Sequence, residues 1–283
     1  MSQPGTYRVV GVQMEPKIGE IASNRTAMIT RLTAAAADGA HLVVFPECAL
    51  TGYGFASRAE AVHVAEPADG PSSQAIKAAL KRLSLFVVYG FLEADGDRLF
   101  NACLLVGPRG VVGVYCKVHL PMLGVDRWVD PGDRPFAVHE AGGLKIGMHI
   151  CYDGSFPETG RVLSLLGADL LVLPTNWPTH SETAAEHMIA TRALENTVYA
   201  IAVNRIGEER GFRYIGRSSI AAPDGQVMAC AGVSREQVIS ADIDVARARQ
   251  KHLVRVPGLH EINRFADRRP AFYGPIVEPN GRE

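Results

Sequence analysis

Residues 144–151 read Leu-Lys-Ile-Gly-Met-His-Ile-Cys, an apolar run with enough alternation for a β-strand. A turn follows the cysteine, and residues 157–166 then have the pattern of a helix. The same order occurs earlier, where the run from His41 to Phe45 predicts a buried strand that ends at Pro46. Short strands alternating with helices of about ten residues indicate a layered α/β fold.

Working outward from these two strands, the same signals cover most of the chain. Residues 7–14 predict the first strand. Ser23 and Asn24 are candidate N-caps for a helix over residues 25–37, which Gly39 closes. Further helices are expected at 72–82 and 182–197, with a basic helix after residue 243. Further strands are expected at 85–92, 100–106, 111–115, 169–173, 199–204, 218–222, 226–231 and 238–243.

No linker, fixed-period repeat or low-complexity segment interrupts this series. We therefore expect a single domain over residues 1–256. Residues 257–283 are rich in proline, glycine and arginine, and we interpret them as an extended C-terminal tail of the same domain.

The composition argues against several classes of partner. The 283 residues are 47% hydrophobic and carry 29 Lys and Arg against 30 Asp and Glu, so the formal net charge is -1. This balance gives no basic surface for nucleic acid or an anionic membrane. No apolar run has the length of a signal peptide or a membrane span, so a cytoplasmic location and a small-molecule partner are expected.

Five cysteines are scattered along the chain without a C-x-x-C pair, which makes a disulfide framework or a zinc site a poor interpretation. Cys151 stands out because it follows a strand and precedes a helix, a position that favours an exposed thiolate. Glu47 and Lys117 follow two other predicted strands. Burial at a strand end raises the pKa of a carboxylate and suits it to proton transfer, so the three residues could act together.

Three stretches in this order, FPECALTGY (45–53), YCKVHLP (115–121) and HICYDGSFPE (149–158), resemble the signatures of the nitrilase superfamily of carbon–nitrogen hydrolases. The resemblance extends from about residue 7 to residue 275. Further matching positions are Val12-Gln13, Pro131-Gly132-Asp133, Arg192 to Asn196, Asn204-Arg205, Arg269-Pro270 and Tyr273.

The resemblance implies an α-β-β-α sandwich, with two mixed sheets face to face and helices outside. It also implies a catalytic triad of Glu47, Lys117 and Cys151. Glu47 would act as acid and base and Cys151 as nucleophile, while Lys117 and the Tyr152 backbone N–H would stabilise the oxyanion. No metal or cofactor is implied. A homodimer or higher homo-oligomer is expected, through the apolar stretch at residues 188–194 and the tail.

The chain departs from the family pattern after the lysine, where many members have a second glutamate. Asp126 is the nearest carboxylate and is a candidate replacement, with a surface pair to Arg127 as the alternative. Tyr53, Trp128 and Trp177 lie next to the motif loops and are candidates for the substrate-binding wall.

Tyr152 and Asp153 after the cysteine favour the amidase or carbamoylase branch over true nitrilases, which usually have Trp-Glu there. Residues 154–156 lack the arginine with which several branches bind a substrate carboxylate, although Arg205 or Arg217 could still do so. The prediction is an amidase that releases ammonia from a small amide. The alternatives are an N-carbamoyl amidohydrolase or a nitrilase of the same family, and a catalytically inactive small-molecule-binding or interaction module. A papain-like cysteine hydrolase and a serine hydrolase are disfavoured because their local signatures are absent.

Overall fold

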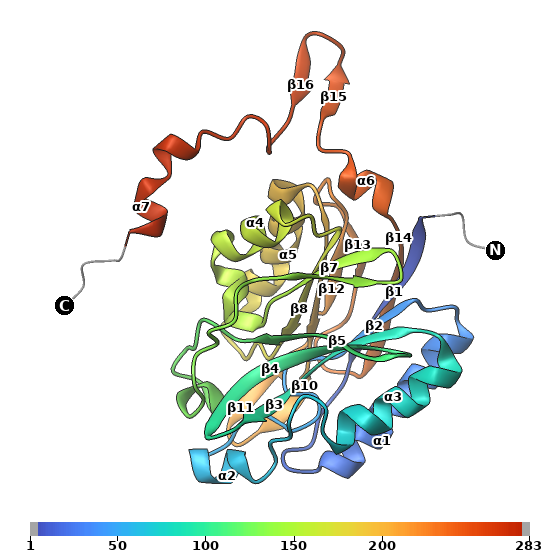
Figure 1. Cartoon of the computed structure of the whole chain (residues 1–283), viewed down its shortest axis with the longest axis vertical. Helices are drawn as coiled ribbons and strands as arrows, with labels where there is room; N and C mark the ends of the chain where they lie inside the picture. Colours follow the sequence, from blue (N-terminus) through green and yellow to red (C-terminus); the bar gives the residue numbers. More distant parts are fainter. Residues whose placement is uncertain (1–4, 279–283) are drawn as a thin grey trace.

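The computed structural model describes residues 5–278, and its centre consists of two six-stranded sheets. The first has the strand order β14-β1-β2-β3-β4-β5 and the second the order β13-β12-β9-β8-β7-β6. In each sheet, three neighbouring strands run parallel (β1, β2 and β3; β7, β8 and β9) and the outer strands are antiparallel. Figure 1 shows the sheets between two groups of helices.

The strands of the first sheet are β1 (Thr6–Gln13), β2 (Leu42–Val44), β3 (Phe86–Asp95), β4 (Arg98–Gly107), β5 (Gly110–Cys116) and β14 (Gln237–Asp244). Those of the second are β6 (Val138–Ala141), β7 (Leu144–Met148), β8 (Leu170–Thr175), β9 (Tyr199–Asn204), β12 (Ser219–Ala221) and β13 (Val227–Cys230). The helices are α1 (Ile21–Ala37), α2 (Arg58–Val62), α3 (Pro71–Leu83), α4 (Pro157–Leu165), α5 (Glu182–Asn196), α6 (Val245–Arg249) and α7 (Gly274–Val277), with short 3-10 helices η1 (Gly124–Arg127), η2 (Cys151–Ser155) and η3 (Pro270–Phe272).

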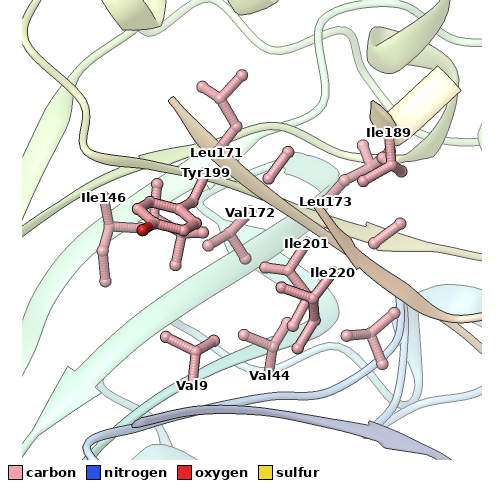
Figure 2. Close-up of a cluster of buried hydrophobic side chains, with 14 of the residues drawn as sticks. Val9, Val44, Ile146, Leu171, Val172, Leu173, Ile189, Tyr199, Ile201 and Ile220 are labelled. Atoms are coloured by element: carbon pink, nitrogen blue, oxygen red, sulfur yellow. The ribbon is translucent and has the colours of Figure 1, made fainter. Parts of the chain in front are cut away.

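The two faces of each sheet pack against different partners, because side chains alternate along a strand. Val9 and Val44 of the first sheet face Val172, Ile201 and Ile220 of the second, as Figure 2 shows. The opposite face of the first sheet packs on α1 and α3. Each fully buried side chain of this kind contributes roughly 1.5–3 kcal/mol. The packing confirms the expected α-β-β-α sandwich.

The first helix begins earlier than the sequence indicated. It starts at Ile21, and Asn24 lies inside it rather than at its N-cap. The reason is that the Asn24 side chain bonds to both backbone groups of Lys17 and to the Leu50 carbonyl, so it joins two loops instead of capping the helix.

Three β-structures were absent from the sequence-based prediction. One is the edge strand β6, and another is the hairpin formed by β10 (Ile206–Glu209) and β11 (Phe212–Ile215). The third is a hairpin of β15 (Leu253–Val256) and β16 (His260–Ile262) at the start of the segment expected to be irregular. Figure 1 shows this hairpin and α7 leading away from the sandwich. None of the helices in residues 5–278 is long and apolar enough to cross a membrane.

Candidate active site

The three residues singled out at strand ends come from both sheets. Glu47 follows β2 and Lys117 follows β5 in the first sheet, whereas Cys151 follows β7 in the second and opens η2. Gly90 of β3 permits the close approach of the chain at Glu47, because a Cβ there would lie 2.2 Å from the Cys48 backbone nitrogen. The ends of strands from two sheets therefore meet at one buried place.

Lys117 is fully buried between two carboxylates. Its Nζ lies 2.8 Å from Glu47 Oε1 and 2.5 Å from Asp126 Oδ2. Burial acts to lower the pKa of Lys117, but the charges of Asp126 and then Glu47 outweigh it and raise that pKa well above its ordinary value. The ammonium therefore stays charged.

Asp126 lies in η1 and points into the site. Arg127, the alternative partner, instead donates to the Gly124 carbonyl and stacks over Trp128. The Tyr53 hydroxyl donates at 2.7 Å to Asp126 Oδ2, the oxygen that also contacts Lys117 Nζ. Gly124 permits this contact, because its φ is +50° and a Cβ there would lie 2.1 Å from the Tyr53 ring.

Asn101 of β4 was missed by the sequence reasoning. Its Nδ2 donates to both Glu47 Oε1 and Asp126 Oδ1, each at 2.7 Å. One amide thus fixes the two carboxylates around the lysine. The available signal was a single asparagine in the apolar run from Phe100 to Val106, a buried polar side chain that requires partners.

The second oxygen of Glu47 has a different environment. Oε2 is buried and has no hydrogen-bond partner. Burial raises the pKa of Glu47; the Lys117 charge opposes this rise and the Asp126 charge adds to it. A carboxylate with one oxygen held and the other free, and with a raised pKa, is suited to accept and return a proton.

Cys151 is 6% exposed, and its backbone φ of +45° is unusual for a residue with a side chain. Burial and then the charge of Glu47 raise the pKa of its thiol to about 12, against the opposing charge of Lys117. The thiol is therefore the resting form. The expectation that the turn and helix N-terminus favour an exposed thiolate is wrong, because the sulfur is buried next to a carboxylate and α4 begins only at Pro157.

Asp153 holds the turn that carries Cys151 and Tyr152. It accepts hydrogen bonds from the Ile150 backbone N–H, the Tyr115 hydroxyl and both the backbone and the ring of His119. Although burial acts to raise the pKa of Asp153, these hydrogen bonds lower it. The carboxylate stays ionised and fixes the position of the nucleophile relative to β5.

The three aromatic candidates occupy different positions. Tyr53 is fully buried and contacts Asp126. Trp177 is 5% exposed and belongs to the buried cluster that also contains Cys151. Trp128 is partly exposed, and its ring nitrogen donates to the Phe55 carbonyl. Only Tyr53 makes a direct hydrogen bond to one of the charged site residues.

No group of three or more His, Cys, Asp or Glu side chains in residues 5–278 is arranged to hold a metal ion. The side chains described above supply a thiol, a carboxylate and a fixed ammonium, which are the groups that nucleophilic attack by Cys151 requires.

Comparison with known proteins gives a consistent result. Residues 8–252 match the family described as carbon-nitrogen hydrolase. A protein named nitrilase from Pyrococcus abyssi is 38% identical over 94% of this chain and 98% of its own length. An (R)-stereoselective amidase from Pseudomonas sp. is 32% identical over 96% of this chain and 95% of its own.

Among solved structures, an amidase from Nesterenkonia sp. AN1 carrying the acetamide moiety of fluoroacetamide on its active-site cysteine has a TM-score of 0.79. It is 20% identical, and the alignment covers 96% of this chain and 98% of that one, so this likeness concerns the fold. The match over residues 8–252 and the relatives that align over nearly their whole length show that the chain belongs to the carbon–nitrogen hydrolase family.

Proposed function

We propose that the chain is an amidase that releases ammonia from a small amide through a thioester on Cys151. The observation that carries this proposal is the buried Glu47, whose free Oε2 and raised pKa suit it to proton transfer in a site that also contains the Lys117 ammonium and the Cys151 thiol.

In the first step, Glu47 accepts the thiol proton while the Cys151 sulfur attacks the carbonyl carbon of the amide. The carbonyl π pair moves to oxygen, and Lys117 with the Tyr152 backbone N–H stabilises the oxyanion. When the oxyanion collapses, the carbon–nitrogen bond breaks and Glu47 returns its proton to the nitrogen, so ammonia leaves.

In the second step, Glu47 takes a proton from water, and the resulting hydroxide attacks the thioester. Collapse expels the sulfur, which recovers the proton from Glu47, and the carboxylic acid leaves. One carboxylate thus alternates between base and acid, and the enzyme returns to its starting state. Asp126 is held by Tyr53 and Asn101 and pairs with Lys117, so its proposed role is to position the ammonium.

The same residues could attack a ureido carbon or a nitrile, and the relative named nitrilase keeps the latter open. Ammonia release from a panel of amides, N-carbamoyl compounds and nitriles separates these activities. We expect amides to react best and Cys151→Ala to abolish release. No ammonia from any compound would favour the inactive binding module.

The proposal includes a cytoplasmic location, a small-molecule substrate and association of two copies of the chain. Large apolar side chains of the tail are exposed, including Leu259, Phe272 and Val277. A groove of about 690 Å³ lies between the tail and α4. In the other expected contact, residues 188–194, Ile189 and Ala193 are already buried within the chain. The tail and α4 are thus the better candidates for the interface.

A further inference from the structure

Several buried polar atoms of Glu47 and of residues close to Glu47 or Cys151 have no hydrogen-bond partner. Eleven such side-chain atoms occur within residues 5–278, and four of them belong to Glu47, Asn176 and Tyr214. For Asn176, both the amide nitrogen and the amide oxygen are unpaired. Because buried polar groups nearly always have partners, their concentration at one place indicates a site whose ligand supplies them.

Thr175 and Asn176 stand at the carboxyl end of β8, which packs against η2. The Thr175 hydroxyl and the Asn176 backbone N–H both act to lower the pKa of Cys151, so both lie beside its sulfur. Asn176 is completely buried. The unpaired carboxamide of Asn176 is therefore part of a residue whose backbone lies next to the reacting sulfur of Cys151.

Tyr214 reaches the same place from β11. The Ile215 backbone N–H donates to the Trp177 carbonyl at 3.1 Å, and that of Thr179 donates to the Arg213 carbonyl at 2.9 Å. The strand thus runs along the segment that follows Asn176. The Tyr214 side chain belongs to the buried cluster that also contains Cys48, the neighbour of Glu47. Burial raises the pKa of Tyr214, so the side chain keeps its proton.

The charged side chains near Asn176 and Tyr214 restrict the kind of ligand that this site can bind. Arg205 lies under the Tyr214 ring at 4.3 Å, but its guanidinium pairs with Glu209 at 2.9 Å and donates to the Pro16 carbonyl. Arg217 is 37% exposed and lies 3.8 Å from Glu186. Both arginines considered for a substrate carboxylate thus have acidic partners, while Asn176 and Tyr214 are uncharged.

We infer that Asn176 and Tyr214 form a subsite for the acyl group, and that the substrate is a small amide whose acyl group carries an uncharged hydrogen-bonding group such as a hydroxyl. The carboxamide and the phenol can each donate and accept, which suits a hydroxyl better than a hydrocarbon or a carboxylate. This inference rests on the proposed amidase activity and names its substrate class.

The test compares glycolamide with propionamide, in which a methyl replaces the hydroxyl, and with malonamate, which carries a carboxylate. A site that hydrogen-bonds a hydroxyl leaves its own buried groups unpaired when the analogue lacks it. We expect kcat/KM for glycolamide to exceed that for propionamide by roughly 5- to 150-fold, the loss typical of one buried hydrogen bond. Malonamate should react more slowly than glycolamide.

Tyr214→Phe and Asn176→Leu remove the unpaired groups with little change in size. Each should reduce the preference for glycolamide over propionamide by at least about fivefold, chiefly through KM. Neither should lower the melting temperature of the free enzyme, because the removed atoms have no partner in the protein. If these polar groups only stabilised the fold, each variant would lower the melting temperature and leave the preference for glycolamide unchanged.

Tyr199→Phe is the matched control. Tyr199 is equally buried, but its hydroxyl accepts a hydrogen bond from the Asp244 backbone N–H at 3.2 Å. This variant should lose stability and keep the wild-type preference.

Equal kcat/KM for glycolamide and propionamide, or an unchanged preference in both folded variants, would refute the subsite and leave the amidase intact. Ammonia release from none of the three amides, and from no other amide in the panel, would refute the proposed function and the subsite with it.

Discussion

Replacing Lys117 has the most direct consequences, because its ammonium lies between two buried carboxylates, Glu47 and Asp126. In Lys117→Met, Glu47 and Asp126 would share Asn101 without a neutralising charge. Removing one partner of a buried ion pair costs about 3–5 kcal/mol. At about 2–4 °C per kcal/mol for a chain of this size, the melting temperature should fall by roughly 6–20 °C at neutral pH.

The pH dependence of this loss identifies its cause. Without the ammonium, burial and the charge of Asp126 raise the pKa of Glu47 further above its value in the unfolded protein. The cost of the ionised Glu47 is present above the raised pKa and is relieved as pH falls through it. The difference in melting temperature between wild type and Lys117→Met should therefore be smaller at pH 5 than at pH 8. If a cavity left by the shorter side chain were the only cause, the difference in melting temperature would be the same at pH 5 and at pH 8.

Turnover should respond differently from stability. Loss of a preorganised oxyanion donor costs on the order of 100- to 1000-fold in kcat. Lys117→Arg keeps the charge, so it should restore part of the stability, but the planar guanidinium cannot replace the compact ammonium and kcat should stay low.

The measurements are kcat for the best amide and thermal melts, with Lys145→Met as the control because Lys145 is an exposed lysine of β7. That control should change stability by less than about 0.5 kcal/mol. If folded Lys117→Met and Lys117→Arg both kept more than about a tenth of wild-type kcat, against the expected loss, the proposed triad would be wrong.

Two further predictions concern Glu47, and a third concerns association of the chain. Glu47→Gln should lose at least about 100-fold in kcat with an unchanged circular dichroism spectrum, because the amide cannot accept the thiol proton; near-wild-type turnover would exclude the role of Glu47. In wild type, kcat/KM should fall as pH drops through a pKa above the ordinary glutamate value, because burial raises the pKa of Glu47 and its ionised form is the base. An acid limb at or below the ordinary value would contradict this assignment. Light scattering should report at least a dimer, and removal of the residues after Pro257 should weaken it; a monomer of the intact chain at micromolar concentration would reject the association.

Much of the fold was predictable because strands such as β1, β7 and β8 are apolar runs, and each of these three is followed by a helical pattern. The β10–β11 hairpin was not, because its strands have four residues each and are partly exposed, so their hydrophobic alternation is weak. The tail hairpin was missed for the same reason, since β15 is largely exposed.

The site divides in a similar way. The predicted strand ends indicated that Glu47, Lys117 and Cys151 lie at the edges of the sheets. The structure also places Asp126 next to Lys117. Asn101 and Tyr214 could not be assigned, because a polar residue within an apolar strand becomes informative only when its neighbours are known. The thiol pKa was predicted in the wrong direction, since burial of the sulfur depends on packing between the two sheets.

The pairing of β1 with β14 also bears on how the protein is made. Thr6 lies opposite Asp244, so one edge of the sheet that carries Glu47 and Lys117 is completed by a strand near the other end of the chain. At about 5–20 residues per second, a ribosome needs on the order of ten to fifty seconds between these two residues. During that time β1 remains an unpaired edge, which exposes the nascent chain to wrong pairing. The newly made enzyme should therefore become active only after β14 has left the ribosome, so amide hydrolysis would report the completion of synthesis.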